Sequence, residues 1–572
     1  MKHGVFASRI TIVSTCIVLF AILVVVKLFF VQILHSKAYD EKADRQFVTT
    51  AADAFDRGTI YFTRKDGREI EAATVVIGYK LAVNPKEITS TSSAYEQISK
   101  LISLDRADFM EKAGKKNDPY EEVATKLTRD QAESIQALNI PGVYLYKEKR
   151  RFYPGNSLSS HAIGFVAWKG DDLAGRYGLE RYYNDVLSRG SEELYVNFFA
   201  EVFSNISNTL FKNEDSDGDI VTTIEPAVQQ YVEAELESIM KKWRSDNAGA
   251  IVMNPKDGSI YAMAFAPKFD LNNFNKVEDV STFSNPLVEN VFEFGSVIKP
   301  LVMASALDMG AVTPTTSYFD KGYVDVGDKR LNNFDKKGRG NATMQDVLNQ
   351  SLNTGMVFVQ QKMGKDAFKK YMLSYGIGEK TGIDLPNESA GLVSNLQTKG
   401  DVEYANAAFG QGIAMTPIEA IRALASISNG GKLVTPHLMK EISYANGGSK
   451  EFEYKVQQTE LKPETSVVIS RMMTTIVDKA MLEGKYKMDH YTIAAKTGTA
   501  QIALPSGKGY YTDRNLHSLF GYFPAYDPKF VMIFFTEYPK GPGSEFAATT
   551  VSEPFMETAK FLLNYYEVAP DR

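Results

Sequence analysis

Cysteine is almost absent from this 572-residue chain, which contains only Cys16. A single cysteine excludes an intramolecular disulfide, so the fold does not depend on an oxidising compartment. Cys16 lies within an apolar run and is typical of a packing or lipid-facing residue. A lipoprotein cleavage site is the alternative, which we disfavour because too few apolar residues precede the cysteine.

Histidine is also scarce, and the six histidines are scattered along the chain. Because no two of them have the spacing of metal ligands, we expect no metal and no cofactor. The net charge of −6 gives no sign of a nucleic-acid partner. Apolar residues make up 44% and charged residues 23% of the chain, which is ordinary for globular protein. A chain of this length predicts two or three domains rather than one core.

Long apolar runs are confined to the N-terminus. Residues 10–26 are uncharged and mostly apolar, and after Lys27 the run continues through residues 28–34. The stretch is long enough to span about 30 Å of hydrocarbon, with Lys27 at an interface. We therefore expect a transmembrane anchor at residues 10–34 after a short tail at residues 1–9. A cleaved signal peptide is the alternative, but the run is long for one and lacks a suitable cleavage site.

The rest of the chain divides at a polar stretch, residues 213–218. Residues 37–215 mix charged helical patterns with glycine-punctuated turns, and we interpret those turns as structural. Residues 218–572 predict an α+β domain of helices and an antiparallel sheet. Its expected elements are a helix at 225–243, β-hairpins at 248–264 and 516–535, and a closing helix at 548–566.

Three short motifs follow one another in this larger domain. They are Ser296-Val-Ile-Lys299, Ser351-Leu-Asn353 and Lys496-Thr-Gly498. Together they match the S-x-x-K, S-x-N and K-T-G set, which supplies a nucleophile, a base, a proton relay and a cationic binding group. The combination indicates acyl transfer through a serine.

Each motif also occurs a second time, as Ser238-Ile-Met-Lys241, Ser245-Asp-Asn247 and Lys380-Thr-Gly382. Ser238 and Ser245 would lie roughly 10 Å apart along one helix, too far to act on one carbonyl. Lys380 lies between glycines and a proline, which predicts a loop. We therefore favour the first set, in which two helix starts and a strand are expected.

The favoured residues divide the chemistry among them. Ser296 is the expected nucleophile, and Lys299, one helical turn later, is the expected base once burial and a second cation lower its pKa. Ser351 can pass the proton to the leaving amine, and Asn353 can hold Lys299 and a substrate amide. Lys496 supplies positive charge for a substrate carboxylate.

The strand expected around Lys496 adds three substrate-binding residues. The hydroxyl groups of Thr497 and Thr499 can share the substrate carboxylate. Gly498 would allow a substrate backbone to come close. The backbone N–H groups of Ser296 and Thr499 are the expected oxyanion hole.

At this point the chain resembles a class B penicillin-binding protein, a monofunctional peptidoglycan transpeptidase. The resemblance runs from the anchor nearly to the C-terminus. Beyond the three motifs, it rests on Asp56-Arg-Gly58, Gly178-Leu-Glu180, Met253-Asn-Pro-Lys-Asp-Gly258, Phe409-Gly-Gln-Gly412 with Thr416-Pro417, and Asn429-Gly-Gly431.

The resemblance implies an anchored enzyme of the cytoplasmic membrane. Residues 1–9 would be cytoplasmic, 37–215 an extracytoplasmic pedestal resembling a dimerisation domain, and 218–572 the transpeptidase domain. Its substrates would be stem peptides ending in D-Ala-D-Ala, and β-lactams would inhibit it. A SEDS-type glycosyltransferase and other wall-synthesis proteins would be its partners.

Two positions depart from the family pattern. Phe294 stands where proline is common and Val297 where threonine is common, and neither contributes a catalytic group. The compact N-terminal module favours the septal over the elongation type. A D,D-carboxypeptidase or β-lactamase, with water as acceptor, and a catalytically silent scaffold for wall synthesis remain the alternatives.

Overall fold

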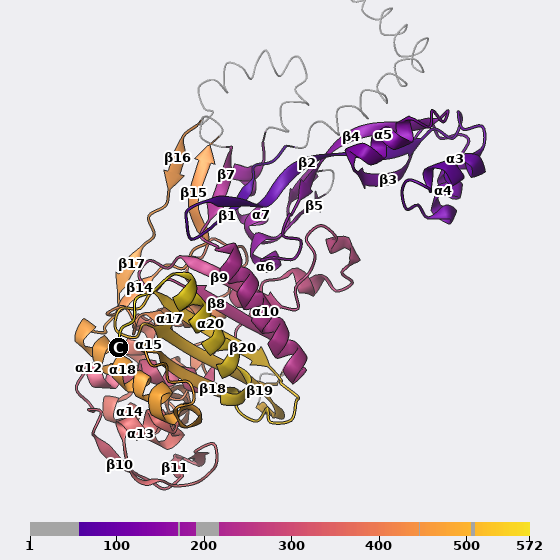
Figure 1. Cartoon of the computed structure of the whole chain (residues 1–572). Coiled ribbons are helices and arrows are strands. Elements are labelled where there is room, and N and C mark those ends of the chain that lie inside the picture. The colour runs from indigo at the N-terminus through magenta and orange to yellow at the C-terminus, as the bar shows by residue number, and fades with distance from the viewer. Residues whose placement is uncertain (1–55, 170–171, 190–216, 445–446, 505–508) are drawn as a thin grey trace, which may run out of the picture. The chain divides into compact units, whose positions relative to one another are not determined.

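The computed structural model describes residues 56–169, 172–189, 217–444, 447–504 and 509–572. By their packing these residues form two compact units (Figure 1). The smaller is residues 75–150, and the larger combines residues 57–74, residues 151–189 and the described residues after 216. The anchor expected at residues 10–34 lies outside the described part, in which no helix is long and apolar enough to cross a membrane.

The smaller unit is a short sheet with three short helices. Strand β2 pairs with both β3 and β4. Buried side chains such as Leu81, Ile98 and Phe109 join the strands to the helices. The elements are β2 (Glu69–Val83, whose first residues belong to the larger unit), α3 (Thr91–Ile98), α4 (Arg106–Ala113), β3 (Glu121–Leu127), α5 (Arg129–Gln136) and β4 (Val143–Phe152).

The first sheet of the larger unit joins segments far apart in sequence. Its strands follow the order β16-β15-β7-β1 and then the start of β2. Short helices and one hairpin follow β4 in the chain. The bounds are β1 (Ile60–Thr63), α6 (Ser160–Ile163), β5 (Val166–Lys169), β6 (Asp172–Gly175), α7 (Gly178–Tyr182), α8 (Asn184–Leu187), β7 (Gly218–Thr222), β15 (Met439–Tyr444) and β16 (Ser449–Glu451).

The second sheet is antiparallel and has the order β18-β19-β20-β8-β9. Both predicted hairpins are confirmed in it, and with them the α+β arrangement of this part of the chain. Strand β18 pairs only with β19 among the described strands, so it forms an edge of this sheet. The bounds are β8 (Asn247–Met253), β9 (Ile260–Ala266), β18 (Ala494–Ala503), β19 (Tyr510–Phe523) and β20 (Phe530–Glu537).

Helix α10 (Pro226–Trp243) confirms the helix predicted before the first hairpin. The Glu225 side chain caps it by accepting from the Val228 N–H, and Pro226 occupies its first turn. Its buried side chains recur at helical spacing and pack against β8, β9 and α20. The single closing helix predicted at 548–566 is instead α19 (Ala547–Thr550) and α20 (Ser552–Tyr565), which meet at Val551, where a φ of −113° distorts the regular helix.

The remaining helices and short strands complete the larger unit. Helix α12 packs against α14, α15 and α18, and α18 also contacts β18. The bounds are α11 (Pro286–Glu289), α12 (Lys299–Asp308), β10 (Ser317–Asp320), β11 (Tyr323–Val326), β12 (Lys329–Asn332), β13 (Gly340–Thr343), α13 (Met344–Asn349), α14 (Asn353–Met363), α15 (Lys365–Ser374), α16 (Asp401–Ala407), α17 (Pro417–Ala425), β14 (Lys432–Val434), β17 (Val456–Gln458) and α18 (Pro463–Thr475).

A buried ion cluster joins two of the turn motifs noted in the sequence. The carboxylate of Glu180 accepts from Arg57 Nε and from Arg151 Nε, each at 2.6 Å, and from the Tyr153 hydroxyl at 3.3 Å. Burial raises the pKa of Glu180, but the charges and hydrogen bonds of the two arginines outweigh it and hold the pKa below its usual value. The Asp56-Arg-Gly58 and Gly178-Leu-Glu180 turns are therefore held together by charge.

Removing the charge at Glu180 should destabilise the larger unit. In Glu180→Gln two buried guanidinium groups lose their anionic partner, and we expect a loss of about 3 kcal/mol of stability. Thermal unfolding of the full-length chain in detergent measures it as a lower melting temperature. Glu553→Gln is the matched control, because Glu553 pairs with Lys242 on the surface and its loss should cost less than about 1 kcal/mol. Equal melting temperatures for both variants would contradict the prediction.

Candidate active site

Ser296 lies on a tight turn at the start of helix α12. A short 3₁₀ segment, Gly295–Ile298, leads directly into the helix. Gly295 has φ +61°, a left-handed conformation that favours glycine. The Ser296 side chain is partly exposed and forms no hydrogen bond with any residue that the structure describes. It is therefore free to meet a substrate.

Lys299 follows one turn later and is completely buried. Its Nζ donates to the Ser351 carbonyl oxygen at 2.6 Å, to Ser351 Oγ at 3.2 Å and to Asn353 Oδ1 at 2.8 Å. Ser351 lies in the turn between α13 and α14, and Asn353 is the first residue of α14. Two of the predicted motifs thus meet at the ammonium group of Lys299.

Ser351 occupies the centre of the cluster in a strained conformation. Its φ of +55° is left-handed, which costs a residue with a side chain on the order of 1 kcal/mol or more. The conformation directs its carbonyl oxygen and its hydroxyl to Lys299, while Lys496 Nζ donates to the same hydroxyl at 3.0 Å. One hydroxyl therefore lies between two lysines.

Burial disfavours the charged form of both lysines, and the charge of Lys496 adds to this effect at Lys299. Lys496 lies on edge strand β18, is 2% exposed, and also donates to the Thr497 carbonyl at 2.8 Å. Burial lowers the pKa of Lys496 to about 7. Burial and then the charge of Lys496 lower the pKa of Lys299 well below its usual value. Lys299 is therefore subject to two effects that favour its neutral form, and Lys496 to one.

Strand β18 continues from Lys496 with Thr497, Gly498 and Thr499. Thr497 and Thr499 share one face of the strand, since side chains alternate. The Thr499 hydroxyl accepts from the Ala547 N–H at 3.2 Å. A Cβ at Gly498 would lie 2.5 Å from the Phe294 carbonyl oxygen and 2.6 Å from Ser518 Oγ. The close approach that requires glycine comes from the chain itself, where β18 packs on the Ser296 turn.

The second copies of the motifs lie elsewhere. Ser238 and Lys241 are exposed on helix α10, and Ser245 follows the end of that helix. Lys380 lies in a loop, as predicted, and the neighbouring Thr381 donates its backbone N–H and its hydroxyl to Glu388, each at 2.6 Å. None of these residues joins the cluster around Lys299.

Sequence reasoning missed two exposed aromatic side chains beside the cluster. Phe334 and Phe546 are 59% and 51% exposed, and their rings meet edge-on with centroids 5.8 Å apart. Phe334 follows the β12 segment and Phe546 precedes Ala547, whose N–H holds Thr499. They are far apart in sequence and share no motif, so only the fold reveals the pair.

Comparison with known families agrees with this fold and site. The family model for the penicillin binding protein transpeptidase domain matches residues 248–558. The model for the penicillin-binding protein dimerisation domain matches residues 56–223. The chain therefore belongs to the penicillin-binding protein transpeptidases, and with both domains it is a class B penicillin-binding protein.

Its relatives are similar over most of their length. Stage V sporulation protein D of Bacillus subtilis is 31% identical over 81% of this chain and 73% of its own. Peptidoglycan D,D-transpeptidase FtsI of Escherichia coli is 24% identical over 100% of this chain and 94% of its own. The chain is thus a serine-type peptidoglycan D,D-transpeptidase of cell-wall synthesis.

Solved structures show the same fold. Penicillin binding protein 2X from Streptococcus thermophilus superposes with a TM-score of 0.71 at 21% identity, over 90% of this chain and 80% of that one. Penicillin binding protein 3 from Mycobacterium tuberculosis, complexed with aztreonam, superposes with a TM-score of 0.67 at 21% identity, over 90% of this chain and 97% of that one. Both support the mixed α/β fold with its dimerisation-type N-terminal part.

Proposed function

We propose that the chain cross-links peptidoglycan stem peptides through an acyl-enzyme on Ser296. The observation that carries the proposal is the Ser351 hydroxyl, which lies 3.2 Å from Lys299 Nζ and 3.0 Å from Lys496 Nζ. This arrangement links a base next to the nucleophile, a proton relay and a cation for the substrate carboxylate. The transpeptidase family supports D-Ala-D-Ala stem peptides as substrates and β-lactams as ligands.

Acylation begins when neutral Lys299 takes the proton of the Ser296 hydroxyl. Ser296 Oγ then attacks the carbonyl carbon of the penultimate D-Ala. The backbone N–H groups of Ser296 and Thr499 stabilise the oxyanion. As the peptide bond breaks, Ser351 passes the proton from Lys299 to the amine of the departing D-Ala.

Deacylation reverses the proton path. An amine of a second stem peptide attacks the ester carbonyl, loses its proton to the relay, and Ser296 recovers its proton from Lys299. The new amide is the cross-link. Lys496, with the Thr497 and Thr499 hydroxyls, holds the terminal carboxylate of the donor during acylation. The unpaired outer edge of β18, with Gly498 at its centre, offers backbone groups to an extended peptide.

We further propose that an anchor at residues 10–34 holds the chain in the cytoplasmic membrane with residues 37–572 outside. The uncharged run at residues 10–26 and the extracytoplasmic location of peptidoglycan support this. A septal role is supported by the FtsI relatives, which match over nearly the whole chain. A SEDS-type glycosyltransferase is the partner that the resemblance implies.

Product analysis with a D-Ala-D-Ala stem peptide as donor and a D-amino acid as acceptor tests the reaction. We expect the exchange product, with an amide to the acceptor, to exceed free acid once the acceptor is in excess. Free acid alone would contradict transpeptidation and leave a D,D-carboxypeptidase. Neither product from a folded chain would favour the scaffold, which the complete hydrogen-bonded set of side chains otherwise disfavours.

A further inference from the structure

Asn353 is oriented by a residue outside the three motifs. Its Nδ2 donates to the Asn332 carbonyl oxygen at 3.0 Å, while its Oδ1 accepts from Lys299 Nζ at 2.8 Å. A carbonyl oxygen can only accept, so it selects the NH₂ end of the amide and turns the oxygen toward Lys299. The position of the backbone at Asn332 therefore determines whether Lys299 Nζ faces the oxygen of the Asn353 amide.

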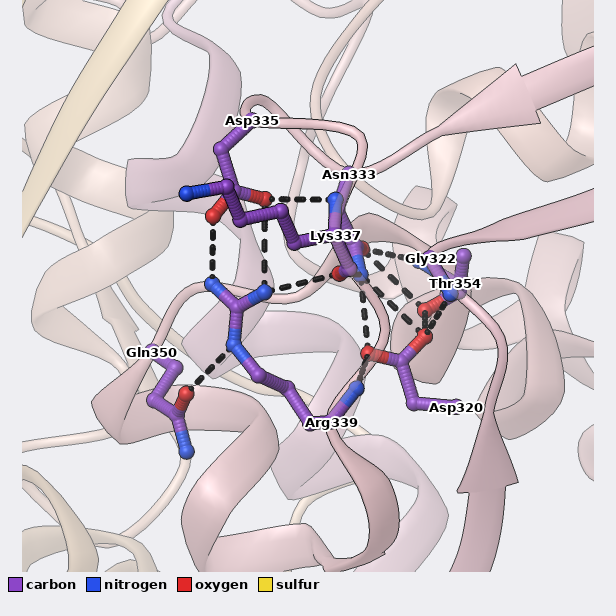
Figure 2. Close-up of polar contacts among 8 residues, drawn as sticks. All are labelled: Asp320, Gly322, Asn333, Asp335, Lys337, Arg339, Gln350 and Thr354. Carbon is purple, nitrogen blue, oxygen red and sulfur yellow. Dashed lines mark hydrogen bonds and ion pairs between the residues drawn. The ribbon is translucent and has the colours of Figure 1, made fainter.

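That backbone is fixed by Asp320, the last residue of β10. Asp320 is 2% exposed, and its carboxylate accepts from the Gly322 N–H at 2.9 Å, the Arg339 N–H at 3.0 Å and Asn333 Nδ2 at 3.0 and 3.1 Å (Figure 2). A fourth donor is the Thr354 hydroxyl at 2.8 Å. One buried carboxylate thus ties both ends of the 321–339 segment to the start of α14.

Asn333 and Arg339 extend the network to both sides of Ser351. The Asn333 Oδ1 accepts from the Thr354 N–H at 3.2 Å, just after Asn353. Arg339 pairs with Asp335 at 2.8 Å, and its Nε donates to Gln350 Oε1 at 2.8 Å, just before Ser351 (Figure 2). The strained Ser351 turn is therefore held at Gln350 on one side and at Thr354, three residues further on, on the other.

We propose that Asp320 is a positioning residue that sets the contact between Lys299 and Asn353 through Asn333 and the 332–339 segment. The proposal rests on the proposed function, because it assigns to Asp320 a part in acylation of Ser296. Asp320 touches no reacting atom. It acts by holding Asn353 Oδ1 where Lys299 donates to it, and small displacements at such contacts are costly for rate.

The test is saturation kinetics of acylation by a fluorescent penicillin, using the full-length chain in detergent. In Asp320→Asn an NH₂ group replaces one carboxylate oxygen, and it cannot accept the hydrogen bonds that this oxygen accepted. We expect the limiting acylation rate to fall roughly 10- to 100-fold. The dissociation constant of the penicillin should change by less than about 3-fold, because Lys496 and the β18 edge are untouched.

Asp325→Asn is the matched control. Asp325 lies on the β11–β12 hairpin, within the 321–339 segment, and pairs with Arg330 on the surface at 2.7 Å, so both constants should keep their wild-type values. If Asp320 had only a general role in folding, its loss would slow acylation by the same factor with or without Asn353. If Asp320 acts through Asn353, its loss should have little effect once Asn353 is gone. We therefore expect Asp320→Asn to slow an Asn353→Ala variant by less than about 2-fold further.

Thr354→Val provides a second variant, which removes one donor to Asp320 and keeps the carboxylate. We expect about 5-fold slower acylation, with the same lack of additivity toward Asn353→Ala. If Asp320→Asn does not fold, this variant decides. The proposal is overturned if Asp320→Asn acylates at the wild-type limiting rate, or, where Asp320→Asn does not fold, if Thr354→Val does. It is also overturned if either variant slows acylation as much in the Asn353→Ala background as in the wild type. Failure of the wild type itself to acylate would instead overturn the proposed function on which it rests.

Discussion

Ser296→Ala is expected to abolish covalent labelling of the full-length chain by a fluorescent penicillin. The acyl-enzyme needs the Ser296 oxygen, and no neighbouring hydroxyl replaces it, because the Ser351 hydroxyl is held between Lys299 and Lys496. Loss of a serine nucleophile lowers the rate by about 10⁴-fold or more. Labelling is read as fluorescence that persists on a denaturing gel.

Ser238→Ala is the matched control for the choice between the duplicated motifs. Ser238 is followed by Lys241 at the same spacing, but both are exposed on α10. Its labelling should equal that of the wild type. Labelling that survives Ser296→Ala and disappears in Ser238→Ala would reverse the assignment. If a folded wild type takes no label at all, turnover of the stem peptide decides between a β-lactam-resistant site and a scaffold.

The elements around the site could be predicted because their signals are local. Helix α10 could be predicted from apolar side chains at helical spacing, such as Val228, Val232 and Leu236, and from Pro226 in its first turn. The hairpins follow from apolar strands around short turns. The motifs that carry Ser296, Ser351 and Lys496 also have fixed spacing. Local patterns of this kind need no knowledge of the tertiary fold.

The buried polar residues that support the fold and the site could not be predicted, because their contacts are distant in sequence. Arg57 and Glu180 are 123 residues apart, and each alone resembles an ordinary residue of a turn. Asp320 accepts a hydrogen bond from Thr354, which is 34 residues away, and no sequence motif links the two residues. Gly498 has no room for a Cβ because Phe294 and Ser518, which lie elsewhere in the sequence, approach it in the fold. Such roles depend on which segments the sheets bring together.

The second large effect concerns Lys299 and the pH dependence of acylation. The reacting form needs a neutral Lys299 as base and a protonated Lys496 as carboxylate binder. We expect rising pH to deprotonate Lys299 first, because burial and the charge of Lys496 both lower its pKa, and the rate therefore to rise. Raising it further deprotonates Lys496, whose pKa burial lowers to about 7, so the rate falls. We expect a bell-shaped profile for the second-order rate constant of penicillin acylation.

Variants at the two lysines separate the limbs of that profile. Lys299→Met removes the base and should slow acylation by about 10³-fold at every pH. Lys496→Arg keeps a cation that is not deprotonated in this range, so the falling limb above pH 7 should disappear even though the different shape of the guanidinium lowers the rate. If the falling limb persists in Lys496→Arg, the group that titrates there is not Lys496.

In the wild type a bound substrate carboxylate favours the charged form of Lys496. The limiting rate should therefore fall at higher pH than the second-order rate constant does. That displacement follows from contact between Lys496 and the substrate carboxylate, and its absence would contradict the binding role proposed for Lys496.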